Sequence, residues 1–148
     1  MTVEIRGQEP PPLEKRSVWR AMWTGFKRRC PNCGKGKLFS GYLKVNETCS
    51  ACGEEFYHHR ADDAPPYFTI TVVAHVVVPG MIFTEGVLHL PVGLQLSIWL
   101  PVTLLLSLLL LPPIKGALIG LQWANYMHGF HPHLDDAEPD PTWAPPAE

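Results

Sequence analysis

The chain has 148 residues, of which 18% are charged, and a formal net charge of −2. This length allows one modest domain or a few membrane elements, and it excludes a large multidomain architecture. The charges are unevenly spread, since eleven of the twelve Lys and Arg residues lie between Arg6 and Arg60 and five acids fall within the last fourteen residues. The near-neutral total therefore hides a basic front half and an acidic tail.

The N-terminal region predicts a disordered leader followed by an amphipathic helix. Residues 1–14 are polar and Pro-rich, and they lack the apolar core of a cleavable signal, so we expect this end in the cytoplasm. Residues 15–29 place apolar side chains on one helical face and cations largely off it. This face suits either the headgroup region of an anionic leaflet or packing within the protein. It consists of Trp19, Met22, Trp23 and Phe26.

Residues 30–60 predict a small cytoplasmic module built on two CxxC pairs with fifteen residues between them. A CxxC pair can direct two thiolates at one ion, and the glycine that follows each pair allows a tight turn. In a reducing compartment, clustered thiols favour a metal site over disulfides. We therefore expect a small β zinc ribbon with two short strands, holding one structural Zn²⁺ without an open coordination position. The predicted ligands are Cys30, Cys33, Cys49 and Cys52.

The same residues leave other chemistries open. Iron in a rubredoxin-like site uses the same four ligands, and a single CxxC pair can exchange disulfides. His58 and His59 lie near Asp62 and Asp63, which suggests a second metal site, although adjacent side chains point in different directions on most backbones. The two aspartates equally fit a helix cap or a contact with a partner's Lys or Arg.

Two long stretches without charged residues predict two transmembrane helices within residues 64–114. One has 21 uncharged residues between Asp63 and Glu85, and the other has 29 between Glu85 and Lys115. At about 1.5 Å per helical residue, each can span a hydrocarbon core of about 30 Å. A hairpin near residues 86–93 contains no Lys or Arg, so the positive-inside bias places it in the periplasm and both termini in the cytoplasm.

His75 lies within the first predicted span. We expect a neutral imidazole bonded to the other helix through Thr103 or Ser107, with the cofactor of a partner protein as the alternative contact. Small residues in and after the spans allow close helix contacts without identifying the helix contacted. These are Gly80, Gly86, Ala117 and Gly120.

Beyond the second span, Pro112 and Pro113 predict a kink or a restart of the helix. Residues 115–127 then predict an interfacial helix, and residues 128–148 predict a disordered acidic tail. The tail contains a weak cluster of possible metal ligands, for which a surface role is the simpler interpretation. These are His128, His131 and His133.

The chain resembles a known family in the order and spacing of several motifs. These are CPNCGKGKLF, CSACG, ADDAPP, WLPVTLLLSLLLLPPIKG and LQW, within residues 19–126. The family is the bacterial membrane proteins called domain of unknown function 983. The resemblance implies a two-helix inner-membrane protein with a zinc-ribbon-like head. One departure is Pro112, which stands where a basic residue is common, so any basic anchor must come from Lys115.

The resemblance also suggests a function. In alphaproteobacteria such genes commonly lie among those for cytochrome c oxidase subunits and assembly factors, which implies an accessory or assembly role for a respiratory haem–copper oxidase. We expect no enzyme activity and no small-molecule substrate, because the chain lacks a phosphate loop, a GxSxG elbow and an HExxH motif. The predicted partner contacts are Asp62, Asp63, His75 and Lys115.

Two other functions remain as alternatives to an accessory role. The cysteines could deliver a metal ion or transfer electrons to the same oxidase. A zinc ribbon with a basic front half also permits nucleic-acid binding. We expect anionic membrane lipid rather than nucleic acid, because the cations surround aromatic side chains at helical spacing next to a bilayer.

Overall fold

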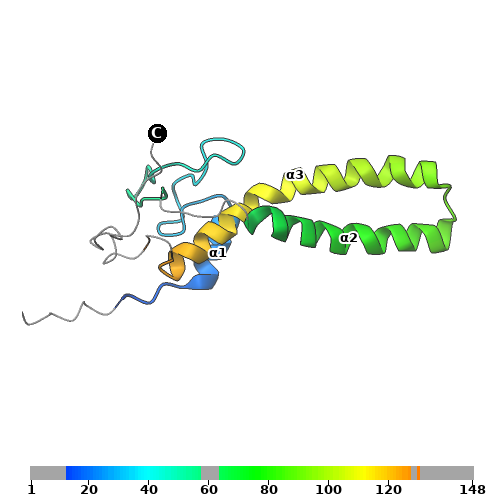
Figure 1. Ribbon diagram of the computed structural model, residues 1–148. Helices are drawn as coiled ribbons and strands as arrows, with labels where there is room; N and C mark the ends of the chain where they lie inside the picture. Colours follow the sequence, from blue (N-terminus) through cyan, green and yellow to red (C-terminus); the bar gives the residue numbers. More distant parts are fainter. Residues whose placement is uncertain (1–12, 58–63, 128–129, 131–148) are drawn as a thin grey trace, which may run out of the picture.

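The computed structural model describes residues 13–57, 64–127 and Phe130. The helices are α1 (Val18–Phe26), α2 (Ala64–Leu88) and α3 (Val92–Ala124). Helices α2 and α3 form a long antiparallel hairpin, and α1 packs across the end of α3 that lies away from the turn (Figure 1). The cysteine module, residues 30–57, lies beside this end, and we call it the head.

Helix α1 is shorter than the predicted segment 15–29. The hydroxyl of Ser17 caps it by accepting a hydrogen bond from the backbone N–H of Arg20 at 3.4 Å. It ends before Arg28, whose φ of 60° is incompatible with a right-handed helix. Two aromatic side chains of its apolar face are not packed within the protein, since Trp19 is 79% exposed and Trp23 is 52% exposed. Of the two interpretations that the sequence left open, intramolecular packing therefore applies to only part of this face, in which Met22 is half-buried.

Small residues allow α1 and α3 to touch through their backbones. Ala21 and Gly25 lie four residues apart on α1, and Gly116 and Gly120 have the same spacing on α3. A Cβ atom on Gly116 would overlap the carbonyl oxygen of Gly25, and one on Gly120 would overlap that of Ala21. This close crossing, with small residues four apart on both helices, holds α1 on α3.

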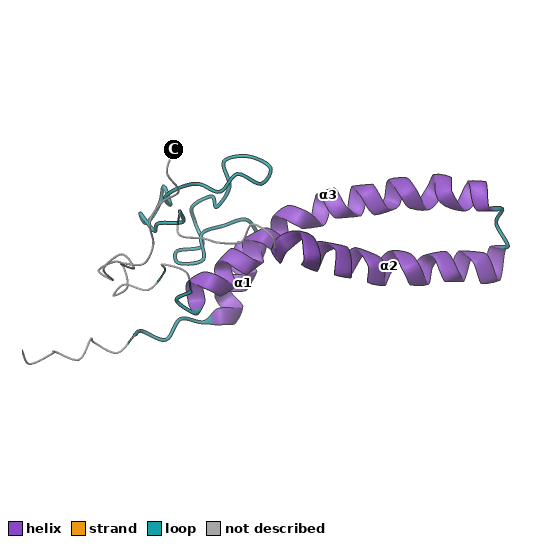
Figure 2. Cartoon of the chain, viewed as in Figure 1, coloured by secondary structure: helices purple, strands orange, loops and turns teal. Residues whose placement is uncertain are grey.

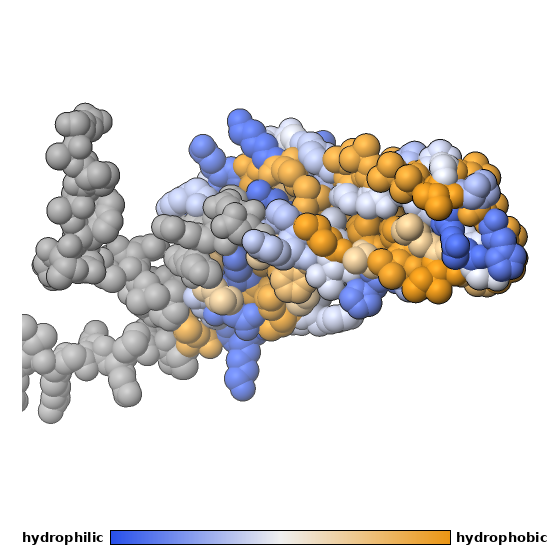
Figure 3. Space-filling view, turned by 45° about the vertical axis from the view of Figure 1, so that its right-hand side comes forward, coloured by the Kyte–Doolittle hydropathy of each residue, from blue (hydrophilic) through white to orange (hydrophobic). Residues whose placement is uncertain are grey.

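Both hairpin helices are long and apolar enough to cross a membrane. With 25 and 33 residues, they measure about 38 and 50 Å at 1.5 Å per residue. Helix α3 is therefore longer than a hydrocarbon core of about 30 Å, and its last third supports the head. Hydrophobic side chains make up much of the hairpin surface seen in Figure 3. Exposed examples are Ile70, Ile82, Leu100, Leu104, Leu105 and Leu109.

Helix α2 packs on α3 through a buried row of residues four positions apart, Thr69, Val73 and Val77. Further along α2, Gly80 makes room for the indole of Trp99, which a Cβ atom would overlap. The predicted small-residue contact at Gly80 is therefore with a side chain on α3 and not with a second backbone.

A polar cluster joins the two helices near the turn of the hairpin. The amide of Gln95 donates to a carboxylate oxygen of Glu85 at 2.6 Å. The Thr84 hydroxyl donates to the Gln95 carbonyl oxygen at 3.2 Å and accepts from the indole N–H of Trp99 at 3.3 Å. Because these groups satisfy one another, Gln95 can be 95% buried without an unpaired polar atom.

Helix α3 continues through Pro112 and Pro113, so the restart predicted at this point is not observed, and residues 115–124 belong to α3. Each proline lacks an N–H, so the carbonyls of Leu108 and Leu109 lose the helical donors four residues ahead. The phenolic hydroxyl of Tyr42, in the head, donates to the Leu108 carbonyl oxygen. The proline pair thus creates an attachment point for the head.

No strand occurs among the residues that the structure describes (Figure 2). The two predicted strands of a β ribbon are therefore not confirmed. Within the head the backbone turns too often to extend a ladder, and pairing is limited to isolated antiparallel bridges. These join Arg29 to Lys37, Phe39 to Val45 and Thr48 to Glu55.

Candidate metal centre

The sulfur atoms of the four cysteines converge on one point of the head. All four Sγ atoms lie within 4.8 Å of one another. The Sγ atoms of Cys30 and Cys52 are 3.7 Å apart, and those of Cys33 and Cys49 are 3.8 Å apart. Zinc binds thiolates at about 2.3 Å, for which the edge of a regular tetrahedron is about 3.8 Å. The donor set therefore fits one tetrahedral metal ion.

The two CxxC pairs have the same backbone geometry. The N–H of Gly34 donates to the carbonyl oxygen of Cys30 at 2.9 Å, and Gly53 donates to Cys49 at the same distance. Both glycines have positive φ, 70° and 75°. Side chains are disfavoured in this left-handed conformation, which explains why a glycine follows each pair.

Backbone N–H groups also point at the sulfurs. The N–H of Lys35 lies 3.4 Å from the Sγ of Cys33, and that of Ala51 lies 3.4 Å from the Sγ of Cys49. Such donors stabilise a thiolate over a thiol because they interact more strongly with the charged form. The backbone of the head thus favours the thiolate form, which is the form that binds a metal cation.

These surroundings shift the pKa values of the thiols in opposite directions. The backbone N–H groups of Gly36 and Lys35 lower the pKa of Cys33 to about 6. Burial raises the pKa of Cys30 far above its usual value, and partial desolvation also raises that of Cys52. Coordination by four thiolates therefore releases protons from Cys30 and Cys52.

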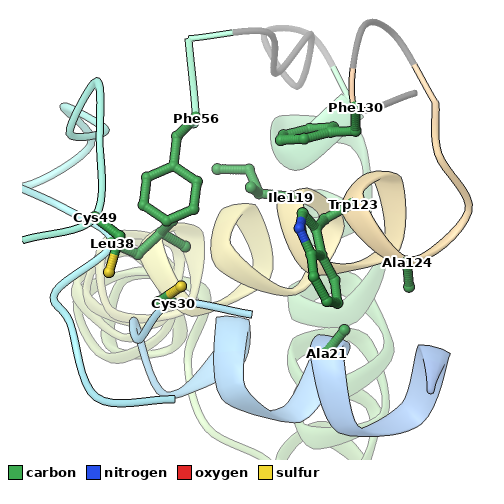
Figure 4. Close-up of a cluster of buried hydrophobic side chains, with 9 residues drawn as sticks. All are labelled: Ala21, Cys30, Leu38, Cys49, Phe56, Ile119, Trp123, Ala124 and Phe130. Carbon is green, nitrogen blue, oxygen red and sulfur yellow. The ribbon is translucent and has the colours of Figure 1, made fainter. Parts of the chain in front are cut away.

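The centre has a buried side and an exposed side. Cys30 is 0% exposed and Cys49 is 3% exposed, whereas Cys33 is half-buried and Cys52 is exposed. The two buried cysteines belong to the hydrophobic core between the head, α1 and α3 (Figure 4). The metal centre is therefore continuous with the core. That core consists of Ala21, Cys30, Leu38, Cys49, Phe56, Ile119, Trp123, Ala124 and Phe130.

A carboxylate that the sequence analysis missed ties the metal centre to α3. Glu54 lies two residues after the second CxxC pair. One of its carboxylate oxygens accepts a hydrogen bond from the indole N–H of Trp123 and the other accepts one from the amide of Asn32, both at 2.7 Å. The guanidinium of Arg16 lies 4.0 Å from the centroid of the Trp123 ring and donates to its carbonyl oxygen at 2.8 Å. No sequence pattern reveals the Glu54–Trp123 pair, because its partners are 69 positions apart.

Substitution of Glu54 with alanine is expected to loosen the head from α3. The substitution removes the acceptor of two hydrogen bonds. A hydrogen bond to a charged group contributes about 1.5–3 kcal/mol, and solvent exposure reduces this value, so we expect the free energy of unfolding to fall by about 2 kcal/mol in total. Thermal unfolding in detergent measures the effect. Glu47→Ala is the control, because Glu47 is a glutamate of the same head whose side chain is exposed, whereas that of Glu54 is half-buried. An equal change in both variants would contradict the assigned role.

Substitution of Gly36 is expected to weaken metal binding. A Cβ atom at this position would overlap the Sγ of Cys49. Gly36→Ala is therefore expected to displace one ligand and weaken metal binding by at least tenfold, as measured by competition with a chelator. Gly41→Ala is the control, because its Cβ would meet only the Lys44 Cβ at an ordinary 3.6 Å. Unchanged retention of metal in Gly36→Ala would argue against this geometry.

Lys115 contacts the head and does not stand free for a partner. Its ammonium group donates to the carbonyl oxygen of Leu43 at 3.2 Å. Together with the bond from Tyr42 to α3, it anchors the loop before Lys44. The other predicted acids and most of the predicted histidines lie outside the described residues. These are His58, His59, Asp62, Asp63, His128, His131 and His133.

The prediction that His75 bonds to α3 is wrong. Its Nδ1 lies 2.7 Å from the carbonyl oxygen of Thr71, on its own helix. Thr103 donates to Trp99 and Ser107 donates to Thr103, both within α3. His75 is exposed on the outer surface of α2, which periodicity alone could not reveal because apolar residues surround this helix on all sides.

Comparison with known proteins identifies one related group. A family model described as "Protein of unknown function (DUF983)" matches residues 39–123, which is more than half of the chain. The match includes Cys49, Cys52, α2 and nearly all of α3. No curated protein and no solved structure matches the chain.

Proposed function

The chain belongs to the DUF983 family, and we propose that it is a non-catalytic membrane accessory protein, whose metal-stabilised head is presented to a larger complex at the membrane surface. In this proposal α2 and α3 cross the bilayer and four thiolates hold one structural Zn²⁺. Two apolar helices of spanning length and the convergence of four sulfurs support it. A complete set of four thiolates leaves no position for a reacting water, which argues for a structural role over catalysis.

The observation that carries the proposal is the continuity between the metal centre and α3. Cys30 and Cys49 share one buried core with Ile119 and Trp123, and Glu54 bonds the head to the same tryptophan. The head therefore has a defined orientation relative to the hairpin. A rigid surface held at a fixed height above a membrane suits the recognition of another membrane protein better than the capture of a diffusing substrate.

The distribution of cations supports a cytoplasmic head, and the proposed location is the inner membrane of a bacterium. Lys27, Arg28 and Arg29 lie at the head end of the hairpin, whereas residues 89–91, which connect α2 to α3, contain no Lys or Arg. Cationic residues are retained on the cytoplasmic side. Both termini would then be cytoplasmic.

The outer surface of the hairpin supports lateral docking against a partner. His75 is exposed there. Pro79 removes the helical donor to the His75 carbonyl, so a polar site lies within an apolar span. Ionisable residues within a span usually face protein or a cavity, so His75 is the proposed contact. A haem–copper oxidase is the proposed partner class, on the basis of the gene association of similar proteins.

Affinity purification from native membranes, followed by mass spectrometry and metal quantification, tests this function. We expect respiratory oxidase subunits to be enriched with the wild type and depleted with His75→Leu, with about one zinc ion per chain in both. The control is Thr71→Val, which alters an exposed side chain one helical turn away and keeps the backbone carbonyl oxygen that contacts the Nδ1 of His75. Recovery of the protein alone, in repeated gentle purifications, would overturn the accessory role.

Metal delivery is a second candidate, and the exposure of Cys52 favours it. An exposed ligand offers an edge at which an incoming thiolate could begin to exchange the metal ion. This function requires substoichiometric metal and reactive thiols in the purified protein. One tightly held zinc ion and thiols that resist alkylation would exclude it.

A further inference from the structure

A cationic cavity lies where the head meets the hairpin. It has a volume of about 470 Å³ and is lined on one side by three consecutive cations after α1 and on the other by apolar residues of α3. Among the residues that the structure describes, no acidic residue lines it. The lining residues are Phe26, Lys27, Arg28, Arg29, Tyr42, Leu108, Leu109, Pro112 and Pro113.

The same three cations also line a second cavity of about 530 Å³, on the head side. Lys35 and Lys37 contribute two further positive charges there, and the described part of the chain places no acidic residue in this lining either. Because charges of one sign in a recess reinforce one another, the pair of cavities attracts anions. The side chains of Lys27, Arg28 and Arg29 are exposed and therefore available to bind one.

The apolar wall of the first cavity distinguishes the kind of anion. Leu108 is 47% exposed and Leu109 is 63% exposed, and both lie on the part of α3 that enters the hairpin. An acyl chain attached to an anionic headgroup could follow these leucines while the headgroup contacts the cations. Neither a free phosphate nor a nucleic acid has a component that matches this aliphatic surface.

The proline pair also leaves a residue of the cavity lining with a carbonyl that has lost its helical donor. Pro113 removes the helical donor of the Leu109 carbonyl, in the same way that Pro112 frees the Leu108 carbonyl that receives Tyr42. An acceptor on a residue that lines the same cavity as three cations suits a headgroup that contains both a phosphate and a hydroxyl donor. A glycerol headgroup has both.

We propose that this cavity binds an anionic phospholipid of the phosphatidylglycerol class, with the phosphate against Lys27, Arg28 and Arg29 and an acyl chain along Leu108 and Leu109. The proposal rests on the proposed crossing of the bilayer by α3. Bound lipid would fill the space between head and hairpin and thereby stabilise the orientation of the head in anionic membranes.

Native mass spectrometry of the full-length protein in neutral detergent tests the proposal, with phosphatidylglycerol or phosphatidylcholine added. We expect at least tenfold tighter binding of phosphatidylglycerol, because each basic contact adds appreciably to the affinity for anionic lipid. Arg28→Asn/Arg29→Gln should remove this preference; asparagine is chosen because Arg28 has a positive φ. The control, Lys35→Gln/Lys37→Gln, removes the same charge from the second cavity only and should retain most of the preference.

Several outcomes would overturn the proposal. They are equal binding of the two lipids by the wild type, equal loss in both double variants, and displacement of the lipid by millimolar inorganic phosphate or by a short oligonucleotide. The wild-type comparison decides the matter even if the arginine variant fails to fold. Extraction of native membranes with alkaline carbonate distinguishes failure of the proposed bilayer crossing from failure of the proposed lipid site. Release of the protein into the soluble fraction would contradict bilayer crossing. Retention in the membrane, together with equal binding of the two lipids, would contradict the lipid site alone.

Discussion

Replacement of Cys49 with serine is expected to abolish tight metal binding and unfold the head. The head has no strand ladder among its described residues, and its core centres on the buried cysteines. Metal coordination supplies on the order of 10 kcal/mol to the folding of comparable small modules, so loss of a ligand removes most of what holds this one together. Metal content by plasma mass spectrometry and limited proteolysis of the head measure the two effects.

The matched control for Cys49→Ser is Ser50→Ala, which alters the exposed neighbouring residue and leaves the four sulfurs in place. It should retain one metal ion per chain and a protease-resistant head. Treatment of the wild type with a strong chelator should reproduce the Cys49→Ser result, because both remove the same ion. A protease-resistant head in the metal-free protein would show that the apolar core suffices without the ion.

Substitution of Gly116 with leucine is expected to separate α1 from α3. The side chain would occupy the space of the Gly25 carbonyl, which belongs to the backbone and cannot rotate away. The helices must therefore move apart, which removes the packing around Ala21 and costs about 3 kcal/mol or more of the free energy of unfolding. Thermal unfolding and protease cleavage within α1 provide the measurements.

Gly86→Leu is the matched control for Gly116→Leu, because it introduces the same side chain in a helix where a Cβ atom meets nothing within 4 Å. It should be neutral or slightly stabilising, by up to about 1 kcal/mol, since leucine has the higher helix propensity. Both variants add the same apolar surface, so the comparison isolates the steric effect. Similar behaviour of the two variants would exclude a backbone contact at Gly116.

The sequence predicted the features that depend on residue type and local spacing. The two CxxC pairs identified all four cysteines that converge, because each pair brings two sulfurs together through local geometry. The uncharged stretches identified both long helices, because helix length and hydropathy are properties of a segment and not of its partners. The family resemblance, which is confirmed, depended on the same motifs.

Other features had a signal that was used only in part, since Gly120 was identified as a residue for close helix contacts but its partner helix was not. Ala21 and Gly25 on α1 and Gly116 and Gly120 on α3 repeat the same four-residue spacing, and this pattern predicts a close crossing only when two helices are considered together. The restart that Pro112 and Pro113 predicted did not occur, and a donor from the distant Tyr42 replaces the lost helical bond of Leu108. Local rules for proline do not include a donor from elsewhere in the chain.

By itself the sequence determined which side chains can bind a metal ion and which segments are long and apolar enough to span a bilayer. Only the tertiary structure decided that the metal centre shares its core with α3, that Glu54 pairs with Trp123, and that the aromatic face of α1 stays exposed. The physical reason is that the first two features depend on interactions between segments far apart in the chain, such as Glu54 and Trp123, which are 69 positions apart. The third depends on which face of α1 packs against another segment. Spacing along the chain encodes the faces of a helix, but only packing selects the face that is buried.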